Sequence, residues 1–250
     1  MIPLFKSHYS IGKSILTLND PTHDKDGGAD SIFSLLLKNN INDLVLVEDS
    51  LTGFLEARKT SFNNEINLIF GLRVSLESFE DQSEHNSKHK VVIFARNDAG
   101  CKLINKIYSE IYSKCNGVGN YNILKKHWNE DSLLLAVPFY DSFLYYNSFS
   151  FSNCIPDFSF CNPIFILENN NLPTDLILND IILKYCKIKN HETLKAKSIF
   201  YNKRSDLESY QTYKCICNRS FGKNQSLSNP GFDGLGSREF CFESYLENNE

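Results

Sequence analysis

The stretch Asp43-Leu-Val-Leu-Val-Glu-Asp-Ser-Leu-Thr-Gly-Phe-Leu-Glu-Ala57 decides the fold of this chain. Its apolar first half is typical of a buried strand, and its second half begins a short helix at Phe54. Similar units follow along the chain. The run Leu68–Leu72 is also apolar, and the apolar run Val91–Ala95 leads into a predicted helix from Ala99 to Tyr112. Strands that alternate with helices indicate a parallel sheet or barrel, whose chemistry lies on the loops after the strands.

Four more apolar runs bring the predicted strands to seven, most of them parallel. These runs are Pro3–Lys6, Ser132–Pro138, Pro163–Leu167 and Lys197–Tyr201. Helices are predicted over Asp175–Cys186 and from Arg204 to about Asn218. The segment Glu77–His89 is polar and predicts an exposed loop, Ser220–Ser237 predicts another, and Ser237–Leu246 suggests a terminal strand. We therefore expect one α/β domain over residues 1–250, with its core at about 1–218 and a C-terminal extension at 219–250.

Composition is that of an ordinary globular protein, with 42% hydrophobic and 22% charged residues among 250. The net charge of −4 gives no overall basic field to attract nucleic acid. A local basic patch of Lys102, Lys106 and Lys114 on one helix is an alternative to a merely solvated helix face.

The sequence also predicts a cytoplasmic protein without a membrane anchor. No apolar run approaches the roughly 20 residues of a membrane helix. The start of the chain is too short and too soon charged for an export signal, so the eight scattered cysteines are expected to stay reduced. The abundance of Asn, Lys, Ile, Phe and Tyr suggests an AT-rich genome, such as that of a phage or a reduced bacterium.

Several blocks in order along the chain resemble the PHP (polymerase and histidinol phosphatase) domain of the bacterial DNA polymerase III alpha subunit. Tyr9-Ser10 is similar to the end of its H-x-H-[ST]-x-Y-S opening, and residues 43–57 are similar to its "ALTDHGNLFGAVEF" block. Residues 90–104 resemble "HLVLLAKNEEGYKNLL" most closely. Weaker blocks lie at residues 67–74, 203–217 and 240–246. The resemblance covers nearly the whole chain and implies a distorted (β/α)7 barrel of the PHP type.

An active PHP barrel holds two or three metal ions, which activate water and stabilise charge on a phosphoester. The resemblance places its metal-binding residues at positions where this chain has other side chains. The two histidines of H-x-H align with Leu4 and Lys6, and the Asp-His pair of the second block aligns with Glu48 and Asp49. The later glutamate and histidine align with Arg73 and Lys90, and a late Asp-x-His falls around Lys197–Phe200. These replacements imply no catalytic residue, no bound metal and no cofactor.

A site with Lys6, Arg73, Lys90 and Lys197 near its mouth is cationic, and Glu48 and Asp49 can pair with those bases. One interpretation is a pocket for phosphate or a nucleic-acid backbone, and the other is a decayed site closed by salt bridges. His85 and His89 are expected in the solvated loop, and no cysteine has a visible partner base.

The resemblance and the replaced metal-binding positions suggest three alternative functions. The first is a catalytically inactive PHP-like module of a replicative DNA polymerase, either a separate subunit or a fragment, that binds the polymerase or another replication protein and reaches DNA through it. The second is a divergent metal-dependent phosphoesterase or nuclease, with a rearranged site that draws on Glu48, Asp49, His8 and His89. The third is a protein that binds phosphate or single-stranded DNA at a cationic barrel mouth. The first predicts no enzymatic turnover by this chain alone.

Overall fold

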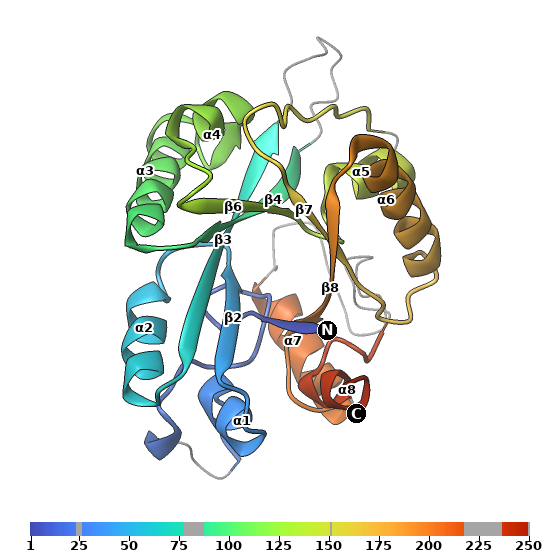
Figure 1. The fold of residues 1–250 in the computed structure, drawn as a ribbon. Helices are drawn as coiled ribbons and strands as arrows, with labels where there is room; N and C mark the ends of the chain where they lie inside the picture. Colours follow the sequence, from blue (N-terminus) through green and yellow to red (C-terminus); the bar gives the residue numbers. More distant parts are fainter. Residues whose placement is uncertain (24–26, 78–87, 151, 218–236, 250) are drawn as a thin grey trace. The chain divides into compact units, whose positions relative to one another are not determined.

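The computed structural model describes residues 1–23, 27–77, 88–150, 152–217 and 237–249 (Figure 1). The chain has a mixed α/β fold and divides into two compact units. Unit 1 comprises Met1–Phe70, Asn169–Pro173 and Ala196–Glu250, and unit 2 comprises Gly71–Glu168 and Thr174–Lys195. Strands β3 (Asn67–Glu77) and β8 (Glu192–Ile199) begin in one unit and end in the other.

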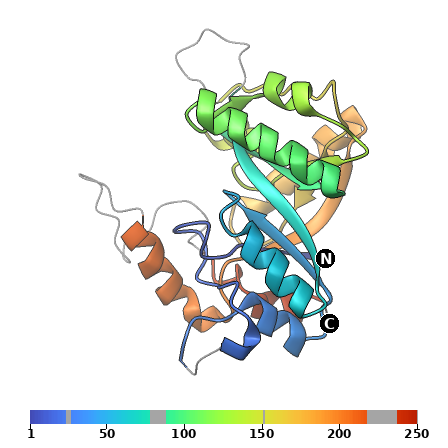
Figure 2. The same cartoon turned by 90° about the vertical axis from the view of Figure 1, so that its left-hand side faces the viewer.

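In unit 1, strand β1 (Ile2–Phe5) lies between β2 (Asp43–Glu48) and the end of β8, and both pairings are parallel. Helices α1 (Ile32–Lys38), α2 (Phe54–Asn63), α7 (Leu207–Cys217) and α8 (Phe242–Glu247) complete it, together with the 3-10 turns η1 (Pro21–His23) and η2 (Arg204–Asp206). Figure 2 shows α2 beside β2 and the first part of β3. The core forms where Phe5 of β1 meets Phe242 of α8, with ring centroids 5.7 Å apart.

In unit 2, strand β4 (Lys88–Ala95) pairs antiparallel with β3 on one side and with β6 (Leu133–Val137) on the other. The parallel strands β7 (Ile164–Leu167) and β8 continue the sheet beyond β6, and the short β5 (Val118–Asn120) pairs with β3. Figure 1 shows α3 (Asp98–Lys114) and α4 (Tyr121–His127) on one side of these strands. Helices α5 (Phe143–Phe149) and α6 (Asp175–Lys189) lie on the other side.

All seven predicted strands are present, and the α/β class is confirmed. Their pairings run in the order β2-β1-β8-β7-β6-β4-β3, and β3 pairs again with β2, so the pairing order closes as that of a barrel does. The antiparallel β3–β4 pair departs from strict strand–helix alternation. Only residues 78–87 separate these two strands, and a parallel crossover needs a dozen residues or more.

Several predicted elements need correction. The terminal strand is wrong, because residues 242–247 form helix α8, whose N-terminus is capped by the Cys241 sulfur accepting from the Ser244 N–H at 3.5 Å. Part of the loop predicted over Glu77–His89 is also wrong, because β3 runs through Glu77 and β4 begins at Lys88, while residues 78–87 lie outside the described residues. The predicted loop 220–237 lies outside them too, apart from Ser237. The single domain over residues 1–250 stays a prediction.

Candidate functional site

Three of the predicted site positions meet where β1 and β2 end in unit 1. Lys6 directly follows β1, Glu48 is the last residue of β2, and Asp49 follows it. Because β1 and β2 are parallel neighbours, with Phe5 opposite Leu46, their carboxyl ends lie at the same edge of the sheet. Leu4, the fourth position in this unit, is buried within β1. The strand pairing therefore brings the lysine and both carboxylates together.

The Lys6 side chain is buried and paired. Its Nζ lies 3.3 Å from Asp49 Oδ2 and donates to the backbone oxygen of Val47 at 3.2 Å. The lysine side chain is 6% exposed, whereas that of Asp49 is 26% exposed. A buried ammonium needs such partners, because an isolated charge is strongly disfavoured away from water. The prediction that the carboxylates of this block pair with nearby bases is confirmed for Lys6 and Asp49.

Glu48 is held differently, by two serines from the segment after β1. The backbone N–H of Ser7 donates to its Oε1 at 2.8 Å, and the Ser10 hydroxyl donates to its Oε2. Ser10 Oγ also accepts from the N–H of Asp49 at 3.0 Å. Burial raises the pKa of Glu48 above its ordinary value, and the hydrogen bonds from Ser10 and Ser7 and the charge of Lys6 act in the opposite direction. Sequence reasoning missed this role of Ser7 and Ser10.

Tyr9, part of the Tyr9-Ser10 block, ties this segment to α2. Its hydroxyl donates to Glu56 Oε2, and this hydrogen bond raises the pKa of Tyr9. The ring covers Gly53, where a Cβ atom would lie 2.7 Å from Tyr9 Cδ2. Glycine at position 53 therefore permits the close approach of the Tyr9 ring to α2.

The remaining two predicted positions meet in unit 2 at a residue that the sequence did not single out. Arg73 of β3 forms an ion pair with Asp141, which lies after β6. The backbone N–H of Lys90 donates to the Asp141 carbonyl at 2.7 Å, and the Tyr146 hydroxyl donates to Oδ1 at 3.3 Å. Asp141 has a φ of 61°, a left-handed conformation that Asp tolerates better than most residues. A single aspartate in a loop carries no sequence signal for this role.

Two further predictions about histidine and cysteine are wrong. His89 lies in β4 and is buried, because β4 starts earlier than its apolar run suggests. Its Nε2 lies 2.7 Å from the Tyr121 hydroxyl, and its Nδ1 lies 3.4 Å from Cys154 Sγ. Cys154 therefore does have a partner base, although both side chains are buried among aromatic rings such as Phe143. His85 lies outside the described residues.

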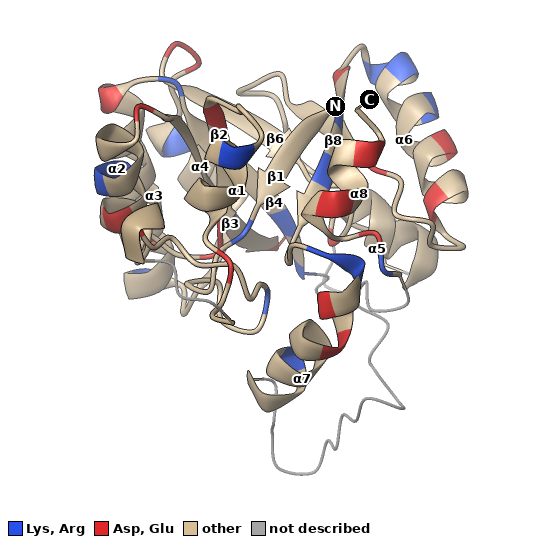
Figure 3. Cartoon of the chain, turned by 90° about the horizontal axis from the view of Figure 1, so that it is seen from below, with Lys and Arg blue, Asp and Glu red and all other residues tan. Residues whose placement is uncertain are grey.

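The proposed basic patch on α3 is divided by an acidic residue. Lys114 and Lys126 pair with Glu110 at 3.2 and 2.9 Å, and His127 Nε2 lies 2.6 Å from its other oxygen. The His127 hydrogen bond, followed by those of the two lysines, lowers the pKa of Glu110 to about 2. Both charge signs also occur on α2, α6 and α7 (Figure 3).

Within the described ranges, no three His, Cys, Asp or Glu side chains gather closely enough to hold a metal ion. No helix in that part of the chain is long and apolar enough to cross a membrane. No protein-family model matches the sequence, and no curated protein matches it. The resemblance to PHP domains therefore stays a prediction.

Proposed function

We propose that this chain is a catalytically inactive PHP-like module of a DNA polymerase III alpha-type protein, and that it serves DNA replication as a structural or interaction module. The observation that carries the proposal is the Lys6–Asp49 ion pair at the ends of β1 and β2. The resemblance puts a metal-binding histidine at Lys6 and part of an Asp-His pair at Asp49. The ammonium supplies the positive charge that a metal ion supplies in an active PHP barrel.

The surrounding contacts support the same proposal. Both oxygens of Glu48 accept hydrogen bonds from Ser7 and Ser10, so this carboxylate is already satisfied by the protein. To bind Asp49, a metal ion would have to displace the Lys6 ammonium, which is covalently attached to the chain and so stays close to this carboxylate. Without a metal-activated water, hydrolysis by the route of the PHP family has no nucleophile.

The two alternatives receive less support from the same contacts. A rearranged metal site with Glu48, Asp49, His8 and His89 would need the ring of His89, whose two nitrogens already contact Tyr121 and Cys154. A cationic anion-binding mouth would need free bases, yet Lys6 and Arg73 are neutralised by Asp49 and Asp141. We therefore favour the module that binds a replication protein.

Association with a replicative polymerase is the expected result. The tagged full chain should co-purify with the polymerase polypeptide of its source, and light scattering after size exclusion should give the mass of a discrete complex. A polymerase that carries an intact PHP domain of its own is the control, because we expect that domain to occupy the binding surface for such a module. Failure to form a complex at micromolar concentrations of both proteins would contradict the proposal.

A further inference from the structure

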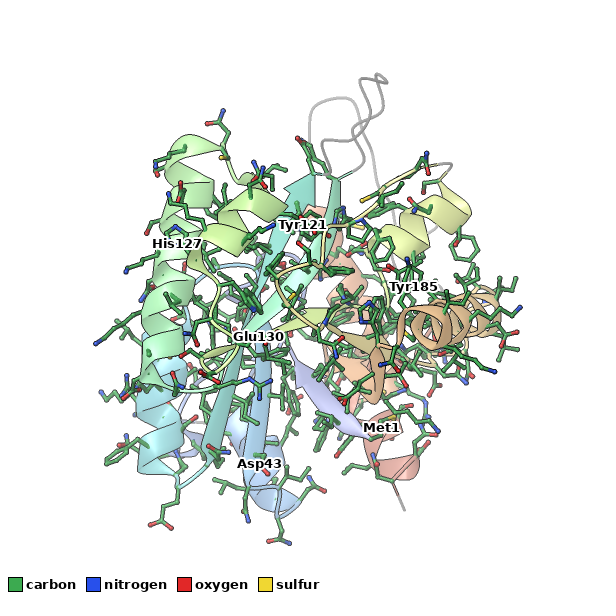
Figure 4. All side chains as sticks on the ribbon, turned by 45° about the horizontal axis from the view of Figure 1, so that its top comes forward. Met1, Asp43, Tyr121, His127, Glu130 and Tyr185 are labelled. Carbon is green, nitrogen blue, oxygen red and sulfur yellow. The ribbon has the colours of Figure 1, made fainter. Side chains whose placement is uncertain are left out.

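Unit 2 contains a cavity of about 510 Å³ that none of the functions above uses. It lies where β6, β7 and β8 begin and β4 ends, away from the Arg73–Asp141 pair near the ends of β3 and β6. Its lining includes Arg96, Trp128, Glu130, Leu134 and Glu192, and Glu130 is labelled in Figure 4. The volume falls within the range of small-molecule sites, roughly 300–1,000 Å³.

Arg96 presents a positioned guanidinium to this cavity. Its backbone N–H donates to the Ser132 carbonyl at 2.9 Å, and its Nε donates to the Leu133 carbonyl at 3.3 Å. Within the described residues, the two terminal nitrogens have no hydrogen-bond partner and the side chain has no ion pair. A guanidinium fixed through Nε leaves its terminal fork available to a carboxylate.

Carboxylates lie on the same lining. Glu130 and Asp131 belong to the loop before β6, and Glu192 is the first residue of β8, opposite Ile164 of β7. Among the residues that the structure describes, none of the three carboxylates has an ion-pair partner. Two strands, β6 and β7, separate Arg96 from Glu192, which places their backbones about 14 Å apart at the usual strand spacing.

The lining also includes apolar side chains. Trp128 packs edge-on against Phe160, with ring centroids 5.2 Å apart, and Leu134 and Ile164 are two further apolar lining residues. Within the part of the chain that the structure describes, the lining thus combines the unpaired Arg96 with three carboxylates and several apolar side chains. A purely anionic ligand would meet three carboxylates, and a purely cationic one would make no use of Arg96.

We propose that this cavity binds a small zwitterion of the amino-acid type, either a free amino acid or a dipeptide. The ligand carboxylate binds the terminal nitrogens of Arg96, and its ammonium group binds the carboxylates of Glu130, Asp131 or Glu192. An apolar side chain contacts Trp128 and Leu134. The site does not depend on the role in replication, because no residue of the Lys6 cluster lines it.

Calorimetric titration of the full chain with the common L-amino acids and with leucyl-glycine and glycyl-leucine tests the proposal. The two sets of probes distinguish a free amino acid from a dipeptide. For the best ligand, the N-acetyl and carboxamide analogues remove the ammonium and the carboxylate one at a time. Each analogue is expected to bind at least about 10-fold more weakly, because it loses a charge-assisted hydrogen bond to the site.

The protein variants complete the test. Arg96→Gln should weaken binding of the parent ligand about as much as the carboxamide does, and should not weaken the carboxamide further. Arg96→Lys and Glu192→Gln provide second variants if Arg96→Gln fails to fold, and Lys102→Gln on the exposed face of α3 is the matched control. Two results would overturn the proposal: no probe binds at millimolar concentration, or the Arg96 variants bind as the Lys102 variant does.

Discussion

Replacing Gly100 by alanine is expected to destabilise the protein by about 3 kcal/mol, although the same change in an ordinary helix stabilises by about 1 kcal/mol. Gly100 lies in the first turn of α3, where its N–H donates to the capping side chain of Asn97 at 3.0 Å. A Cβ atom there would lie 2.1 Å from the Ser132 carbonyl oxygen and 3.2 Å from the Ala95 Cα. Both neighbours are backbone atoms, so α3 would have to move as a whole.

Urea unfolding measures this effect, and the neighbouring Ala99→Gly variant is the matched control. Ala99 is exposed one residue earlier in the same helix, so its replacement should reduce stability by only about 1 kcal/mol. A Gly100→Ala variant as stable as the parent would show that α3 does not approach the turn before β6 as described.

Replacing Lys6 by methionine is expected to reduce stability by about 3 kcal/mol at neutral pH, because it leaves Asp49 and the buried Glu48 without their cation. The deficit should grow as pH rises. Burial already holds the pKa of Glu48 above its ordinary value, so this group favours the unfolded state increasingly as pH rises through the raised pKa. The charge of Lys6 opposes the rise in the pKa of Glu48. Removing Lys6 therefore raises this pKa further, and the loss of stability extends to higher pH.

Thermal unfolding between pH 4 and 8 measures the effect of Lys6→Met on stability. The control is Lys59→Met, at an exposed position of α2, which should change stability by less than about 0.5 kcal/mol. The double variant Lys6→Met/Asp49→Asn should be less destabilised than the sum of its single changes. Additive effects, or a deficit that shrinks as pH rises, would contradict an ion pair that stabilises the ends of β1 and β2.

Apolar runs predicted the strands well because a buried strand shows its burial directly in sequence. All seven runs correspond to strands, and the helices after Asp98, Asp175 and Leu207 were also predicted. The three-residue β5 and the helices α4 and α5 were missed, since short aromatic and polar segments carry little periodicity. The terminal segment was predicted as a strand because its apolar residues alternate, yet the cap at Cys241 starts a helix.

Part of the candidate site could be predicted for a similar reason. Lys6, Glu48 and Asp49 directly follow or end two strands, so parallel pairing of those strands sufficed to bring them together. The partners in unit 2 could not be predicted, because Asp141 reaches Arg73 through tertiary contact and lies 68 positions away in the chain. Ser7 and Ser10 were missed because a serine that donates to a buried carboxylate looks like any loop serine.

We propose that the Lys6 ammonium takes the place of a metal ion at the ends of β1 and β2. Calorimetric titration of Mn²⁺ into the metal-free full chain tests this claim most directly. We expect no binding tighter than millimolar, and no hydrolysis of DNA or of a phosphomonoester in the same solution, because the ammonium already pairs with Asp49. Binding of about one Mn²⁺ per chain that Asp49→Asn abolishes, accompanied by hydrolysis that the same change removes, would contradict the account.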